Sequence, residues 1–511
     1  MSQEEEVLAV GSGSILLSLA ESCFESGLSK FTVFVTNSQP TDTAKLTKLW
    51  EHALHNDPGA LLNILTTTDD EDPNWRTIVR PYSFIFYVSQ HGDLEELQKL
   101  QNACIEERKQ MLPALALRGK GMAGPLLHPD GYGRFESAWR RIHSSVFPEE
   151  RDQQLLSAAA ADVLSNLIVY EWHKTVAGEK EPECKNQCFI LDPVTLTGNW
   201  HPLLAHPLVS GYETACPVEN IEQSLERSHE PMDPEEWFSC FNRLTSPVTG
   251  VFHVWEEADL IQLPLAQCLV QPVDLLSEGP AHLLPAIVRS GLTHEEARLE
   301  SGLAGLEAYA ARMKQMLFSG LPSYQREGIG IGAGCTIAEA VGRGLRSCLT
   351  KELDKRMLPN ELVVTRIVCT HIEDIRCRYY LRALSIIEGE PIIAVGEPLL
   401  GFPVVWVYSG SSWYGSVDLS LTHALRQSLQ KALNKTARVA SSSAAVKDHE
   451  AQDITIPNSD PMIYAPLVLS AIQTLKQHQK RLELFDMRSG SLLGKGTFLI
   501  YGVLLGEEEI P

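Results

Sequence analysis

The feature that most constrains the fold is a regular alternation of short apolar runs and helical patterns over the first 130 residues. Residues 7–10 form an apolar run that ends at Gly11, and apolar side chains then recur at helical spacing until Gly27. Further runs of strand length lie at residues 31–35, 61–65, 84–88 and 112–117, and a long helix is predicted over 153–174. Because strands that alternate with helices pair in parallel, this half predicts an α/β, Rossmann-like sheet that is doubly wound.

The second half of the chain follows a different pattern. Strand-like pieces lie at residues 251–255, 363–369, 391–395 and 404–408, and helical patterns lie near 294–317, 336–355, 418–435 and 462–484. Strands and helices without strict alternation predict an α+β domain. Clustered prolines over 200–240 mark a boundary. We predict one domain over 1–215, a linker over 216–240 and a second domain over 241–511, with a disordered loop in the Ser/Ala-rich stretch 439–460.

Composition and charge exclude several classes of function. Of the 511 residues, 44% are hydrophobic and 21% are charged, which is typical of a folded globular protein. No window reaches the roughly 18 apolar residues of a membrane helix. The first six residues include three Glu, unlike a secretory signal, so we expect a cytoplasmic protein. The net charge of −22 opposes general binding to nucleic acid or to an anionic membrane.

A glycine-rich turn, Gly11-Ser12-Gly13, separates the first predicted strand from the first helix. Glycines in this context let the backbone approach a pyrophosphate at a helix N-terminus. However, Leu16 stands at the third glycine of the GxGxxG pattern, and Thr36-Asn37 stands where an acidic ribose ligand would end the second strand. The turn therefore predicts either a nucleotide site or, more simply, a tight turn that needs glycine for steric reasons.

The first domain resembles the ThiF-like, ubiquitin-activating superfamily through residues 7–35, 124–129 and 134–137. That resemblance implies an adenylation-type Rossmann fold. Arg134 and Ser137 stand where relatives carry paired zinc-binding cysteines. The eleven cysteines are scattered without any CxxC, and Cys184 and Cys188 form the closest pair. We therefore expect reduced thiols and no bound metal.

The second domain resembles YcaO domains, which use ATP to activate a backbone amide oxygen so that a Cys, Ser or Thr side chain can close an azoline ring. The resemblance rests on residues 244–251, 293–298 and 330–336. The matching motif positions are Ser301 and Glu307 of the first ATP motif, Glu339 of the second, and Gln430 of the third. Other positions of these motifs hold Ala304, Ala308, Ser347, Thr350, Lys351 and Gln427.

Magnesium prefers oxygen ligands, usually carboxylates, and four of the carboxylates that the YcaO motifs imply are missing here. Thr293 with Glu296, and Thr336 with Glu339, also fit capping boxes that any helix could use. The motifs thus favour a degenerate ATP site, whose residues serve only packing, over a working ATP site. Neither ATP nor magnesium is predicted as a firm cofactor.

Along nearly the whole chain the sequence resembles the ThiF-like maturation proteins of thiazole-containing bacteriocins. The resemblance implies a partner that scaffolds or activates a separate ATP-dependent YcaO cyclodehydratase acting on a precursor peptide. Only six residues precede the first strand, so we expect the leader-binding winged-helix domain of this family on another chain. Two alternatives remain open. The chain could itself be an ATP-dependent cyclodehydratase, or an NAD-dependent oxidoreductase, which rests only on Gly11 and Gly13.

Overall fold

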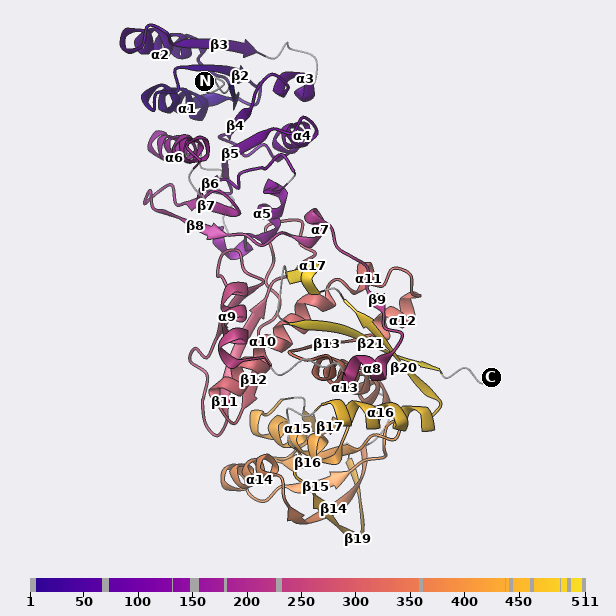
Figure 1. The fold of residues 1–511 in the computed structure, drawn as a ribbon. Coiled ribbons are helices and arrows are strands. Elements are labelled where there is room, and N and C mark those ends of the chain that lie inside the picture. Colours follow the sequence, from indigo (N-terminus) through magenta and orange to yellow (C-terminus); the bar gives the residue numbers. More distant parts are fainter. Residues whose placement is uncertain are drawn as a thin grey trace. The chain divides into compact units, whose positions relative to one another are not determined.

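The computed structural model describes residues 6–66, 73–130, 132–147, 156–178, 182–226, 232–357, 362–436, 438–440, 444–459, 464–487, 489–493 and 498–507. They form two compact units. The first unit contains the residues up to Gly211 together with 247–250 and 277–283, and the second contains the others. The chain therefore passes from one unit to the other several times along its sequence (Figure 1).

An eight-stranded sheet with the order β3-β2-β1-β4-β5-β6-β7-β8 forms the centre of the first unit. Its parallel strands are β1 (Val7–Gly11), β2 (Lys30–Val35), β3 (Leu61–Thr66), β4 (Phe84–Ser89) and β5 (Gln110–Leu117). Its antiparallel strands are β6 (Lys120–Ala123), β7 (Gln187–Leu191) and β8 (Gly198–Pro202). The strand order reverses between β1 and β4, as in doubly wound sheets, so the predicted α/β, Rossmann-like fold is confirmed.

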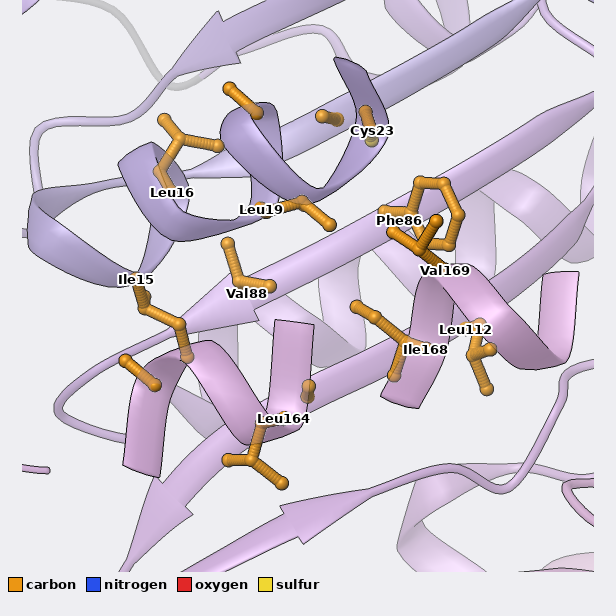
Figure 2. Packing of buried hydrophobic residues seen from close by; sticks show 14 of the residues in the cluster. Ile15, Leu16, Leu19, Cys23, Phe86, Val88, Leu112, Leu164, Ile168 and Val169 are labelled. Atoms are coloured by element: carbon orange, nitrogen blue, oxygen red, sulfur yellow. The ribbon is translucent and has the colours of Figure 1, made fainter. Parts of the chain in front are cut away.

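Helices cover both faces of this sheet. The helices are α1 (Gly13–Glu25), α2 (Thr43–Asn56), α3 (Trp75–Val79), α4 (Leu94–Glu106), α5 (Phe135–Arg141), α6 (Ala158–Val176) and α7 (Pro207–Ser210), with a 3₁₀ turn at Ser144–Val146. Figure 2 shows Leu19 of α1 beside Val88 of β4, and Ile168 of α6 belongs to the same apolar cluster. A second cluster, with Leu97 and Leu100 of α4, fills the opposite face. The predicted helix over 153–174 is α6, and residues 153–155 lie outside the described part.

The second unit contains three sheets, ordered β10-β11-β12, β13-β21-β20-β9 and β18-β17-β16-β15-β14-β19. Their strands are β9 (Cys216–Pro217), β10 (Phe252–Glu256), β11 (Ala266–Pro272), β12 (Ile287–Gly291), β13 (Gly330–Gly334), β14 (Leu362–Ile372), β15 (Ile392–Val395), β16 (Val404–Ser409), β17 (Ser412–Val417), β18 (Arg438–Ala440), β19 (Ala444–Ile456), β20 (Lys480–Asp486) and β21 (Leu499–Glu507).

Ten helices of the described part pack against these sheets. They are α8 (Ile221–Glu226), α9 (Pro234–Leu244), α10 (His294–Ala311), α11 (Lys314–Leu317), α12 (Ser323–Gly328), α13 (Ile337–Met357), α14 (Ile375–Glu388), α15 (Leu421–Asn434), α16 (Ala465–Gln477) and α17 (Ser489–Leu493). α13 and α16 share a core with the four-stranded and six-stranded sheets, while α14 and α15 pack on the six-stranded sheet in a separate core. The predicted α+β class of the second half is confirmed.

Three stretches differ in detail from the sequence-based expectation. Residues 216–240, predicted as a linker, include β9, α8 and most of α9, whose Trp237 is buried. The stretch 439–460, predicted as a disordered loop, contains most of β18 and all of β19, and residues 441–443 and 460 lie outside the described part. The helical pattern over 462–484 breaks at Gln479, whose φ is +56°, and continues as β20 because Leu482 and Leu484 alternate inward as in a strand. In the described part, no helix is both long and apolar enough to span a bilayer.

Candidate functional site

The glycine turn of the first unit is closed by neutral side chains. A Cβ at Gly11 would lie 2.2 Å from the backbone oxygen of Val88, so the strand needs glycine for packing. The backbone N–H of Gly13 donates to Oγ1 of Thr41 at 2.8 Å, which occupies a donor that a phosphate would need. Gln39 also reaches the turn, since its Oε1 lies 2.5 Å from where a Cβ of Gly13 would be. Gly11 and Gly13 therefore have a steric use that requires no ligand.

An acidic cluster lies beyond the ends of β2 and β4. The carboxylate of Glu96 accepts from the hydroxyl of Tyr87 at 3.0 Å and from Thr36 at 3.4 Å. Burial, together with nearby Asp93, raises the pKa of Glu96 above its ordinary value. Thr36 stands at the position where a dinucleotide-binding fold carries its acidic ribose ligand. Its side chain is buried and hydrogen-bonded to this carboxylate. Negative charge at this position disfavours a phosphate group.

In the second unit, the glycines of Gly330-Ile331-Gly332-Ala333-Gly334 let β13 lie directly against α13. A Cβ at Gly332 would lie 2.0 Å from the backbone oxygen of Ala340, and one at Gly330 would lie 2.2 Å from that of Gly344. Distances under 3.0 Å leave no room for a side chain. The motif that resembles a YcaO nucleotide segment is thus a close strand–helix contact (Figure 1).

Two carboxylates of α10 share one arginine of α13. The Nε of Arg343 donates to Oε1 of Glu307 at 2.6 Å, and its Nη1 donates to Oε2 of Glu300 at 2.7 Å. Glu300 and Glu307 are seven residues apart and so lie on one face of the helix. The side chain of Arg343 is 6% exposed, against 33% for Glu300 and 21% for Glu307. A buried guanidinium therefore satisfies both carboxylates, and we name these three residues the Arg343 cluster.

The remaining predicted acid, Glu339, lies near the Arg343 cluster but is used for capping. Its Oε2 accepts from the backbone N–H of Cys335 at 2.8 Å, and its own N–H donates to Oγ1 of Thr336 at 3.1 Å. The hydroxyl of Thr336 thus caps α13 as in a capping box, while the carboxylate of Glu339 reaches one residue further back, to Cys335. Burial raises the pKa of Glu339, and the charges of Glu300 and Glu307 act in the same direction although Arg343 opposes them.

Glu300 of the Arg343 cluster differs from Glu339 in the direction of its pKa shift. Burial alone would raise the pKa of Glu300, but Arg343, Arg346 and Arg289 hold it below its ordinary value. Burial likewise disfavours the charged form of Arg343, yet the two carboxylates raise its pKa well above the usual range. Glu300 and Arg343 therefore both favour their charged forms and stabilise each other as an internal ion pair.

The third YcaO-like motif splits between two separate networks. Gln427 donates through Nε2 to Oδ2 of Asp418 at 2.8 Å, and Nε of Arg346 lies 3.1 Å from the same oxygen. Gln430 donates instead to the hydroxyl of Tyr380 at 3.1 Å. Thus Gln427 joins α15 to α13, whereas Gln430 joins α15 to α14.

Ser301 lies apart from the other predicted site residues. It is fully buried, its hydroxyl donates to the backbone oxygen of Arg298 at 2.9 Å, and it accepts from Nε1 of Trp255 at 3.1 Å. Lys351 is also directed elsewhere, since its Nζ donates to the backbone oxygen of Ile329 at 2.7 Å. Of the predicted residues, the structure brings together Glu307 and Glu339, and it places Ser301 and Gln430 in other contacts.

Neither the positions compared with zinc-binding cysteines nor the closest cysteine pair gathers into a metal site in the described part of the chain. Ser137 accepts from the backbone N–H of His206 at 2.8 Å. Cys184 and Cys188 are buried, and burial raises the pKa of Cys188 to about 12. No group of three or more His, Cys, Asp or Glu side chains in that part is arranged to hold a metal ion.

Sequence reasoning missed Glu300, Arg343 and Arg346. A signal existed for two of them, because Glu300 and Glu307 are spaced by two helical turns and so share a face. Arg343 follows Glu339 by four residues and therefore lies on the same side of α13. Their pairing across two helices depends on tertiary packing, which neither spacing indicates.

Solved structures of heterocyclases share this fold. One, described as a heterocyclase in complex with substrate and cofactor, matches with a TM-score of 0.59 and 12% sequence identity over 98% of this chain and 80% of that one. The heterocyclase TruD matches with a TM-score of 0.53 and 14% identity over 98% and 79% of the two chains. Neither a protein-family model nor a curated relative matches the sequence. The predicted order, a Rossmann-like domain followed by a YcaO-like domain, is confirmed as a fold.

Proposed function

We propose that this chain is a maturation protein in the biosynthesis of a ribosomal peptide with thiazole or oxazole rings, such as a bacteriocin. In this proposal it scaffolds or activates a separate ATP-dependent YcaO cyclodehydratase. The observation that carries the proposal is the position of Arg343, which donates to both Glu300 and Glu307.

The Arg343 cluster does not fit a magnesium–nucleotide site. Magnesium between phosphates needs oxygen ligands that are free to bind it. Here a guanidinium that is 6% exposed already neutralises both carboxylates of α10. Displacing Arg343 would leave its buried charge without a partner, which costs several kcal/mol. In this proposal the chain keeps the fold of a heterocyclase, while the guanidinium of Arg343 binds the carboxylates that a magnesium ion would need.

The fold supports a role in the same kind of pathway. The two heterocyclase structures match 98% of this chain, so both domains are kept together. One of those structures is described as containing substrate and cofactor. We infer that the partners of this chain are a precursor peptide and an intact cyclodehydratase, and that the complex works in the cytoplasm.

A second candidate function is that the chain is itself an ATP-dependent cyclodehydratase. The observation that favours it is the convergence of Glu300, Glu307 and Glu339 around Arg343, with a third of the Glu300 side chain exposed. A rearrangement that released Arg343 would leave three carboxylates near one another. This candidate requires that rearrangement, whereas the scaffold function requires none.

Reconstitution with a precursor peptide separates the two candidates. The full chain is mixed with the peptide and Mg-ATP, with and without an intact cyclodehydratase, and ring formation is followed by mass spectrometry as loss of one water per ring. We expect no loss with this chain alone and faster loss when it is added to the enzyme. Glu339→Gln is the matched variant, and it should keep the stimulation. Ring formation by the chain alone, abolished by Glu339→Gln, would establish the second candidate instead.

A further inference from the structure

One face of α14 is exposed although it has the apolar spacing of a packed helix. Ile375, Tyr379 and Ile386 are 64%, 43% and 76% exposed. Together with the exposed Arg382 they are spaced by four, three and four residues, which places all four on a single stripe. The opposite face contains buried residues such as Tyr380 and Leu384. The helix therefore has one covered apolar face and one uncovered stripe.

A neighbouring loop extends this stripe. Ile261 and Leu263, between β10 and β11, are 75% and 80% exposed. The hydroxyl of Tyr379 donates to the backbone oxygen of Pro264 at 2.7 Å, which holds the loop beside the helix. Leu265, the next residue, is buried in the same core as Tyr380. The hydrogen bond and the buried Leu265 thus place the loop beside α14 within the second unit.

The helix side of this surface carries two positive charges in a chain of net charge −22, while the loop also carries the exposed Asp259. Arg378 and Arg382 are exposed, and neither forms an ion pair with a residue that the structure describes. The nearby Arg376 and Arg426 instead pair with Glu296 and Asp374. We call Ile261, Leu263, Ile375, Arg378, Tyr379, Arg382 and Ile386 the α14 surface. It combines exposed apolar groups with two guanidinium groups that are available to carboxylates.

We propose that the α14 surface docks an acidic amphipathic helix of a partner protein. Ile375, Tyr379 and Ile386 of the stripe accept the apolar face of such a helix, while its carboxylates pair with Arg378 beside the stripe and with Arg382 within it. A second copy of this chain fits less well, because a twofold interface centred here would bring guanidinium groups together. An anionic membrane is disfavoured by the net charge of −22. This inference does not depend on the proposed function.

The test uses two labelled helical peptides with the same leucine stripe, one with Glu along its edges and one with Lys. Fluorescence polarisation measures their binding to the full chain. We expect the Glu peptide to bind, the Lys peptide not to bind, and the affinity to fall as salt is added. Reversing both charges in Arg378→Glu/Arg382→Glu should weaken binding by roughly tenfold or more. Lys45→Glu/Lys48→Glu, a double variant with the same change in charge at exposed positions of α2, should not alter it.

A second pair of variants tests the apolar part. Ile386→Glu should abolish binding, whereas Tyr324→Glu, at a residue of α12 that is 73% exposed, should leave it unchanged. Circular dichroism confirms that each variant is folded. Equal binding of both peptides, or no binding of the Glu peptide, overturns the proposal. So does a dimer in sedimentation velocity that Arg378→Glu dissociates, or binding to phosphatidylserine vesicles that the same change removes.

Discussion

The glycine turn of the first unit and the β13–α13 contact of the second both resemble nucleotide-binding segments, but different chemistry fills them. At Gly13 the backbone N–H is taken by the neutral hydroxyl of Thr41. In the second unit, Arg343 is taken by Glu300 and Glu307. One segment is closed by a neutral hydrogen bond, and the other by a buried ion network.

This difference predicts which of the two segments is more sensitive to mutation. A neutral hydrogen bond contributes about 1 kcal/mol and can be replaced by water. A buried charge that loses its partner costs several times more. We therefore expect changes in the Arg343 cluster to affect folding strongly, and equivalent changes at the glycine turn to affect it weakly.

The largest effect is expected for Arg343→Met. This change leaves Glu300 and Glu307 without their shared cation, and it should lower the free energy of unfolding by about 3–5 kcal/mol. Urea denaturation of the full chain, followed by circular dichroism, measures the loss. The triple variant Glu300→Gln/Glu307→Gln/Arg343→Met should recover part of it, because positions 300 and 307 then carry no charge. A loss below about 1 kcal/mol, the scale of an exposed ion pair, would contradict the buried network.

An intermediate effect is expected where alanine replaces glycine. Gly332→Ala places a Cβ 2.0 Å from the backbone oxygen of Ala340, so β13 must move, at a cost of about 2–3 kcal/mol. Gly13→Ala meets the flexible end of Gln39 and mainly strains a φ of +74°, at a cost of about 1–2 kcal/mol. The urea denaturation midpoints of the two variants test whether Gly332→Ala is the more destabilising change. A larger loss for Gly13→Ala would reverse the comparison.

The smallest effect is a difference in pH dependence between two neighbouring acids. The folded pKa of Glu339 is raised by burial, so its ionised form lowers stability as pH rises through that pKa. Glu339→Gln should therefore gain stability over the parent at pH 8 and lose this advantage near pH 4. The folded pKa of Glu300 is lowered through Arg343, so its contribution is present above the unfolded pKa and is lost as pH falls.

Glu300→Gln is the matched variant for that comparison. It should be less stable than the parent at pH 8, and the difference should shrink in acid. Thermal unfolding of both variants across pH 4 to 8 measures the two slopes. Slopes of the same sign would show that Arg343 does not distinguish the two carboxylates.

Much of the fold could be predicted because local patterns decide it. The runs at 7–10 and 31–35 became β1 and β2, and Asp93 caps α4 by accepting from the N–H of Glu96 at 2.9 Å. The helices predicted near 336–355 and 418–435 became α13 and α15. Buried parallel strands and capped helices carry their signals within a few residues.

The rest depends on contacts between distant segments. The sequence pattern did not predict α9, because it lies in a proline-rich stretch. Pro234 nevertheless suits the first turn of a helix, and Trp237 is buried. Motif matching located Glu307 and Glu339, but the structure gives the central place to Arg343, which no motif position included. Its role depends on Glu300 and Glu307, some forty residues earlier on another helix.

The most direct test of the central claim is calorimetric titration of the full chain with Mg-ATP, and with ATP alone as the control. Because Arg343 already occupies the carboxylates of α10, we predict no tight binding in either titration. Micromolar affinity that requires magnesium and disappears in Glu339→Gln would contradict the account and identify a working nucleotide site.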